Sequence, residues 1–197
     1  LKPITVQALH KALDKVAAQI QEERRDQENL HKLRDQVQEY QSVLKEKFLL
    51  KLVMGAPSST EAIEQSHALN LDLVARCYQV MVIRVERCDP ALPFNYPECQ
   101  KVHQVIGGLV ENNPDVFLLE KDPEELVLIM KGNTPEYLLE ENELLVRRIE
   151  QQVQDCNSKL VIATGTCKKR IADIYQSFIE AVVNVQDKAT PPRPADD

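Results

Sequence analysis

The sequence predicts an α+β protein: a long N-terminal helix that can pair with a second helix, then a small domain of the ferredoxin-like plan. Two observations predict it. Residues 4–54 contain no proline and no glycine, and good helix formers dominate them. From residue 77 onward, short β-branched segments alternate with amphipathic stretches in the order β-α-β-β-α-β-α. That order predicts an antiparallel sheet with helices on one face.

The apolar residues of the long helix, expected over residues 5–55, recur every seven positions. One row holds Leu9, Val16, Glu23, Leu30, Val37 and Leu44. A companion row holds Leu13, Ile20 and Gln27, and then Leu33, Tyr40 and Lys47. Two rows at this spacing are typical of a coiled coil. The predicted dimer seam is Leu13, Val16, Ile20, Leu30, Leu33, Val37, Tyr40 and Leu44.

The middle of this helix is entirely polar, from Gln21 to Asn29. Glu23 and Gln27 occupy seam positions there, and the companion row changes sides between Ile20 and Leu33. The stretch is either a soft segment where the register can change, or a solvated helical connector between two modules. The sequence leaves both interpretations open, as it does parallel and antiparallel pairing.

A connector is expected over residues 56–72. Before it, residues 48–54 are apolar on most sides, which predicts that the helix end is buried against the next domain. Gly55 and Pro57 end the helix. Ser58 and Glu61 form a capping box for a short helix over 59–69.

The α/β domain is expected over residues 73–187, and residues 188–197 read as a flexible, proline-rich linker. Strands are expected over 78–85, 116–119, 125–130 and 160–164. Helices are expected over 98–111, 134–157 and 171–185. Gly107 and Gly108 lie inside the first of these helices, and Gly165 follows the last strand at a strand-to-helix turn.

Charge and cysteine usage exclude several classes of protein. The net charge of −7 argues against a nucleic-acid surface in this chain, because phosphate binding needs a concentrated basic face. The five cysteines include no C-x-x-C pair and match no metal spacing. Free thiols in a cytoplasmic protein are therefore expected. The apolar runs are too short to span a bilayer.

The N-terminal residues resemble the end of a response-regulator receiver domain. Leu1-Lys2-Pro3-Ile4 is followed by Leu9, Ala12, Leu13 and Val16, as in that domain's last loop and final helix. The resemblance implies that residues 1–20 are the C-terminal end of a receiver. It also implies that Lys2 is the switch lysine that contacts the phosphorylated aspartate, and that an upstream sensor kinase is a partner.

Residues 45–187 resemble the middle region of AraC-type response regulators of the YesN kind. The resemblance rests on KEKFLLKLVMG, on the strand LVIATGT, and on a final helix with Tyr175, Ser177, Glu180 and Ala181. It implies a degenerate GGDEF-like domain, similar in fold to nucleotidyl cyclases. It also implies a transcriptional output domain further along, through which alone DNA would be bound.

The residues needed for cyclase chemistry are altered. A cyclase requires two glycines in the hairpin turn and acidic residues that hold magnesium. The hairpin reads Asp122-Pro123-Glu124-Glu125, and Pro123 has no N–H to offer a phosphate. In the first strand, Glu86 lies between Arg84 and Arg87. We therefore expect no enzyme activity, no catalytic residues, no metal and no cofactor, and expect Glu124 and Glu125 to be ordinary hairpin residues.

Taken together, the sequence predicts a non-catalytic homodimeric region that transmits receiver phosphorylation to an output domain. The alternative is a small-ligand or nucleotide sensor in the same signalling protein. It would use the cleft between the first strand, the loop over residues 89–97 and the turn over residues 121–125.

Overall fold

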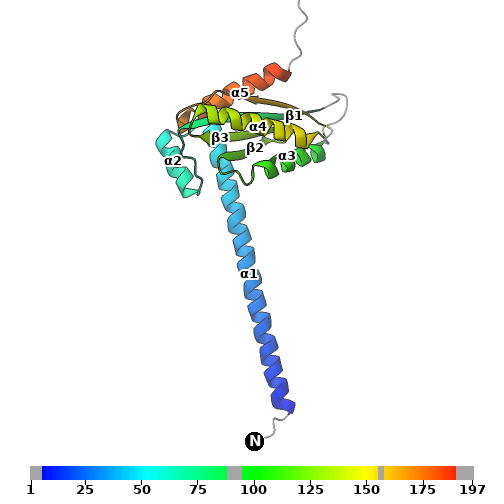
Figure 1. The fold of residues 1–197 in the computed structure, drawn as a ribbon. Coiled ribbons are helices and arrows are strands. Elements are labelled where there is room, and N and C mark those ends of the chain that lie inside the picture. Colours follow the sequence, from blue (N-terminus) through cyan, green and yellow to red (C-terminus); the bar gives the residue numbers. More distant parts are fainter. Residues whose placement is uncertain (1–5, 88–94, 155–157, 190–197) are drawn as a thin grey trace, which may run out of the picture. The chain divides into compact units, whose positions relative to one another are not determined.

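The computed structural model describes residues 6–87, 95–154 and 158–189, with side chains from residue 19 onward (Figure 1). The chain divides into two compact units, residues 1–44 and residues 45–197. The described elements, in chain order, are α1 (Val6–Val53), α2 (Ser59–Ala68), β1 (Cys77–Arg87), α3 (Tyr96–Val110), β2 (Val116–Asp122), β3 (Glu125–Gly132), α4 (Pro135–Val153), β4 (Ser158–Thr164), the 3₁₀ turn η1 (Ile171–Asp173) and α5 (Ile174–Ala189).

Helix α1 is one continuous helix of 48 residues, as the absence of proline and glycine predicts. Its last turns belong to the second unit, where Phe48, Leu49, Leu52 and Val53 are buried. The expected burial of this end is confirmed. Gly55 follows at a φ of 72°, the left-handed conformation that commonly terminates a helix.

Helix α2 begins with the predicted capping box. The Glu61 N–H donates to Ser58 Oγ, and the Ser58 N–H donates to the Glu61 carboxylate at 2.9 Å. Its inner face contributes Ala62 to the core of the second unit.

The sheet of the second unit has four antiparallel strands in the order β2-β3-β1-β4. This is the ferredoxin-like arrangement, so the predicted fold class is confirmed. Central strands β1 and β3 are apolar on both faces, and β3 is buried along its whole length. Strands β2 and β4 form the two edges.

One detail of the prediction is wrong: helices cover both faces of the sheet. Helices α3 and α4 pack on one face, over Met81, Ile83 and Leu128 (Figure 1). Helix α5 and the end of α1 pack on the other, over Val80 and Val127. The reason is that β1 and β3 alternate apolar side chains to both sides, and each apolar face must be covered.

Some element boundaries also differ from the expectation. Strand β2 continues to Asp122, with an irregularity between Glu120 and Asp122, so the hairpin turn is shorter than its polar sequence indicates. Helix α4 ends at Val153, whereas the sequence predicted a helix to residue 157. Along the described helices, none is long and apolar enough to cross a membrane.

Candidate functional site

The hairpin joining β2 and β3 is where the sequence analysis placed the remnants of a nucleotide site. Its two predicted acids have different surroundings. Glu125 begins β3 and is only 4 % exposed, whereas Glu124 lies in the turn and is exposed. The Asp122 carboxylate accepts the Glu124 N–H at 2.9 Å and so closes the turn on itself.

Glu125 is held by two cations. It lies opposite Arg84 in the β1–β3 register, and its Oε2 lies 2.8 Å from Arg84 Nη2. Its Oε1 lies 2.6 Å from Lys121 Nζ. Burial alone would raise the pKa of Glu125, but the hydrogen bonds and charges of Lys121 and Arg84 outweigh it and lower this pKa. Glu125 is therefore ionised, and its two ion pairs hold the start of β3 to β1 and β2.

The candidate acid of the first strand is also paired. Glu86 lies opposite Lys159 in the β1–β4 register, and the Lys159 ammonium lies 2.9 Å from its carboxylate. Glu86 and Glu125 thus each form ion pairs with cationic side chains on neighbouring strands. Among the described residues there is no group of three or more His, Cys, Asp or Glu side chains placed to hold a metal ion.

A hollow of about 300 Å³ lies beside this hairpin, in the second unit. Helix α3 lines it with Tyr96, Cys99, Gln100 and His103; Glu46, Glu120, Asp122 and Pro123 complete it. His103 is 8 % exposed, and its buried Nε2 has no hydrogen-bond partner among the described residues. The other ring nitrogen, Nδ1, lies 3.7 Å from the Glu120 carboxylate.

Cys99 and His103 line the same hollow, which was not predicted from the sequence. The signal was present, because residues four apart on a helix share one face. Burial, together with the charges of Glu124 and Glu98, raises the pKa of the Cys99 thiol. The thiol is therefore neutral near pH 7, which suits packing and weak polar contacts better than nucleophilic attack.

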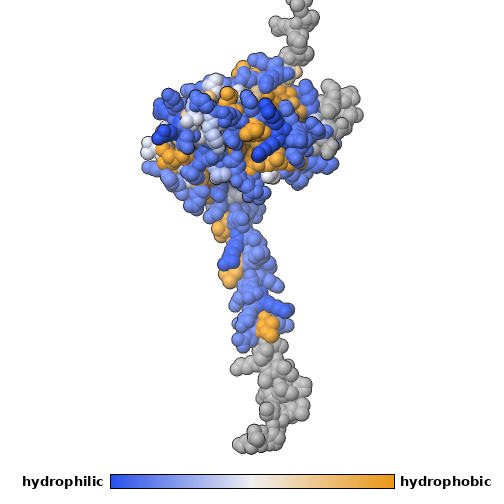
Figure 2. Space-filling view, in the orientation of Figure 1, coloured by the Kyte–Doolittle hydropathy of each residue, from blue (hydrophilic) through white to orange (hydrophobic). Residues whose placement is uncertain are grey.

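The predicted seam residues lie on α1, and the residues that line this hollow include none of them. Five of them have exposed side chains: Ile20, Leu30, Leu33, Val37 and Tyr40. Leu44 is half-buried. Leu13 and Val16 lie on the helix, but their side chains are outside the described ones, and Lys2 is outside the described residues. Figure 2 shows apolar side chains interrupting the otherwise hydrophilic surface of α1.

A second polar cluster joins the segment after β4 to α5. The Glu180 carboxylate accepts hydrogen bonds from Thr166 N, Thr166 Oγ1 and Lys168 Nζ, at 2.7, 2.6 and 2.6 Å. Burial alone would raise the pKa of Glu180, but these bonds and the Lys168 charge lower it to about 2. Glu180 therefore ties the strand-to-helix segment to the last helix.

We expect this carboxylate to make stability depend on pH. Because its pKa is lower in the folded protein, its contribution is present above its ordinary pKa of about 4.5 and disappears as pH falls toward 2. Urea unfolding should show that Glu180→Gln is less stable than the native chain at pH 7, and that the difference shrinks between pH 4.5 and pH 2. If the difference in unfolding free energy between the two chains did not change with pH, the lowered pKa of Glu180 would be contradicted.

The order of the elements and of the strands defines a ferredoxin-like α+β domain, with a tight hairpin between β2 and β3. The model of the GGDEF-like domain family matches residues 54–183. The match covers more than half of the chain, and the chain belongs to the GGDEF-like domain family. Such a domain fits a signalling protein. No curated protein matches the chain.

Proposed function

We propose that this chain is the non-catalytic dimerisation and signal-transmission region of a cytoplasmic two-component response regulator. In this proposal a sensor kinase phosphorylates an upstream receiver, and the change alters the pairing of α1. The GGDEF-like domain relays that change to a DNA-binding, transcriptional output domain. The observation that carries the proposal is the row of exposed apolar side chains on α1.

That row is unusual for a helix surrounded by water. Leu30, Leu33, Val37 and Tyr40 are 56 %, 58 %, 56 % and 65 % exposed, and they recur at the spacing of a coiled-coil seam. Single exposed apolar residues are ordinary, but a periodic row along one face marks an interaction surface. A second copy of the same helix offers the same spacing, so it can bury the row along its whole length.

The polar middle of α1 is where we infer that signalling acts. Glu23 and Gln27 occupy seam positions there, and such residues weaken a coiled coil because they gain little on burial. A weak segment between two apolar ones allows the register to change at low cost. The receiver part of the proposal rests on the resemblance around Lys2 and Pro3.

The non-catalytic part is supported by the hairpin. Magnesium-dependent phosphoryl transfer needs free carboxylates beside the metal and close backbone approach to the phosphates. Here Glu125 and Glu86 are paired with cations, and Pro123 replaces a glycine-type turn. Placing a metal at Glu125 would first require displacing Arg84 and Lys121.

The association state of the native chain tests the proposal. Sedimentation equilibrium of residues 1–197 should give twice the monomer mass at micromolar concentration, with dissociation on dilution. A chain that stays monomeric at all concentrations would contradict dimerisation through α1. Chemical cross-linking between opposite α1 helices then distinguishes parallel from antiparallel pairing.

The hollow beside α3 favours one alternative, a small-ligand or nucleotide sensor. The specific observation is the unpartnered Nε2 of His103, since a buried polar atom without a partner is costly. A thermal-shift series with GTP, other nucleotides and magnesium tests this alternative. Stabilisation that disappears in His103→Phe would support a sensor, and product formed from GTP would contradict the non-catalytic proposal.

A further inference from the structure

The free edge of the sheet, at β4, carries backbone groups that the sheet itself does not use. The Gly165 N–H donates to Val80 O at 2.9 Å, so Gly165 faces β1. In an antiparallel pair the direction alternates, so Val161 and Ala163 also face β1. Ile162 and Thr164 therefore point their N–H and C=O groups away from the sheet.

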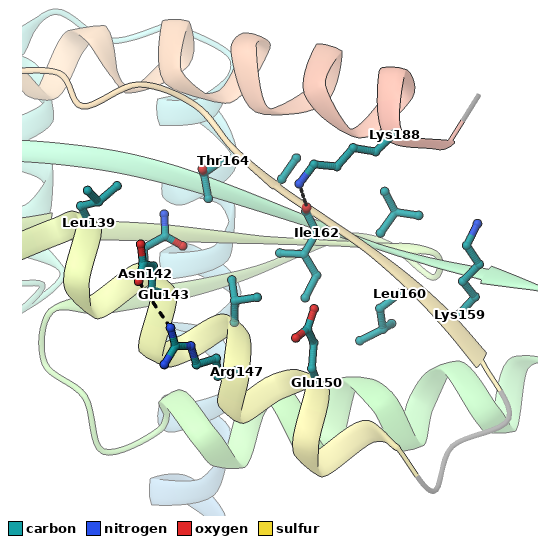
Figure 3. A pocket seen from close by; sticks show the side chains of 13 residues that line it. Leu139, Asn142, Glu143, Arg147, Glu150, Lys159, Leu160, Ile162, Thr164 and Lys188 are labelled. Atoms are coloured by element: carbon teal, nitrogen blue, oxygen red, sulfur yellow. Dashed lines mark hydrogen bonds and ion pairs between the residues drawn. The ribbon is translucent and has the colours of Figure 1, made fainter. Parts of the chain in front are cut away.

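Two side chains of α5 donate hydrogen bonds to the outward carbonyls of Ile162 and Thr164. Lys188 Nζ donates to Ile162 O at 2.7 Å, and Asn184 Nδ2 donates to Thr164 O at 2.8 Å. Figure 3 shows Lys188 reaching from α5 to the edge of β4. Both residues are exposed, so these donors can leave without uncovering the core. The two side-chain donors lie in the positions that the N–H groups of an added β-strand would take.

A groove runs along this edge, between β4 and α4. Its volume is about 740 Å³, within the range of ligand sites, and residues 159–164 line it over almost the whole strand. Leu139 and Val146 of α4 and Leu160 and Ile162 of β4 provide apolar walls. Over α4, Figure 2 shows an apolar patch beside strongly hydrophilic side chains.

Among the described residues that line this groove, one buried side-chain oxygen has no hydrogen-bond partner. Asn142 is 5 % exposed and lines the groove, and its Oδ1 has no hydrogen-bond partner among the described residues. Figure 3 shows it pointing from α4 toward the strands. A buried acceptor of this kind favours a ligand that supplies an N–H or O–H donor.

We propose that this groove binds an extended peptide segment of a partner protein, which adds a strand to the edge of β4. The segment carries apolar side chains at alternate positions, which lie on the apolar walls, and an acidic residue beside them. The acidic residue is needed because of Lys188. When a peptide N–H donates to the carbonyl of Ile162, it displaces the Lys188 ammonium, which then needs a new anionic partner. Strand addition between an edge strand and a helix is a recurring mode of peptide recognition.

The peptide mode fits this groove better than a small anion does. Arg147 lies 3.7 Å from Glu143 and Lys159 lies 2.9 Å from Glu86, so neither is a free anion site. The outward N–H groups of Ile162 and Thr164 also need acceptors spaced as along an extended backbone. The inference goes beyond the proposed dimer, because the groove lies on α4 and β4 and uses no seam residue.

The test uses a capped probe, acetyl-Thr-Val-Glu-Val-Thr-Val-amide, and two N-methylated forms of it. One form carries methyl groups on the valine nitrogens, and the other on the remaining nitrogens. In an extended peptide the N–H groups of alternate residues point to opposite sides, so only one of the two sets faces β4. The form that is methylated on the set facing away from β4 should bind as the unmethylated peptide does. The other should bind at least about tenfold more weakly. Binding is followed by amide NMR shifts and hydrogen exchange in the full chain.

The expected result is shifted and slowed amides at Ile162 and Thr164, with Val161 and Ala163 unchanged because they already pair with β1. Thr164→Pro should abolish binding, since an edge strand tolerates proline but loses its outward donor. Thr164→Ser keeps the N–H and should bind like the native chain. A cooperative thermal unfolding transition for each variant serves as the control that both variants fold.

Four results would overturn the proposal. The first is no shift at Ile162 and Thr164 at millimolar peptide. The second is equal binding of the two N-methylated forms, which indicates contact through side chains only. The third is unchanged binding in a folded Thr164→Pro chain. A small carboxylate such as hexanoate giving the same slowed exchange as the peptide would equally overturn strand addition.

Discussion

Replacing Leu30 and Val37 together with glutamate is expected to convert the chain from a dimer to a monomer. Both side chains are 56 % exposed in the single chain and lie one heptad apart in the same seam row. Burying each such side chain contributes about 1.5–3 kcal/mol, and a dimer buries four of them. Even if half of that is realised, the dissociation constant should rise at least about a hundredfold.

The matched control shifts both substitutions by one position. His31→Glu with Gln38→Glu introduces the same two side chains at the same spacing, but outside the seam. In the single chain His31 lies 3.9 Å from Asp35, and both side chains are exposed, so the loss of this contact costs little. Sedimentation equilibrium should find this control dimeric and the seam variant monomeric. If the seam variant dimerises as tightly as the control, α1 does not pair through these rows.

The second large effect is expected at Gly165. Its backbone is fixed on both sides, because its N–H donates to Val80 O and its carbonyl accepts from Gln79 Nε2 at 2.8 Å. A Cβ there would lie 1.9 Å from the carbonyl oxygen of Ser177. That oxygen belongs to α5, whose neighbouring Ile174 and Phe178 are buried in the core, so the helix backbone cannot yield locally. We expect Gly165→Ala to lower the free energy of unfolding by about 3 kcal/mol or more.

Gly108 provides the control for this substitution. It lies within α3, and a Cβ built there meets nothing within 4 Å. Gly108→Ala should therefore raise the free energy of unfolding by about 0.5–1 kcal/mol, because alanine favours the helix more than glycine does. Urea unfolding of both variants measures the difference. Equal stability of the two would show that Gly165 does not approach α5 as closely as the structure places it.

Much of the architecture could be predicted because it depends on periods along the chain. The helix over Val6–Val53, the capping box at Ser58 and the order of four strands all arise from local spacing and propensity. The seam rows could be predicted for the same reason. Their exposure in the single chain agrees with a surface for a partner, and the identity of that partner stays a prediction.

The candidate sites were less accessible from the sequence. The ion pair of Glu125 with Arg84 was not predicted, because the two residues are 41 positions apart in the sequence. Only the register of β1 against β3 brings these two together. The helical spacing of Cys99 and His103 predicts that they share one face of α3. Glu120 and Pro123 complete the hollow only because β2 and the hairpin pack beside α3, which the local sequence does not specify.

The sequence by itself determined the long helix, the capping box at Ser58 and the order of the strands along the chain, because each depends on residues close together in the chain. Only the tertiary structure decided that both faces of the sheet are covered, that cations hold Glu86 and Glu125, and that α5 side chains sit on the free edge of β4. The physical reason is that these contacts depend on strand register and on helix packing against the sheet. Both result from the burial of many side chains at once, which no local pattern specifies.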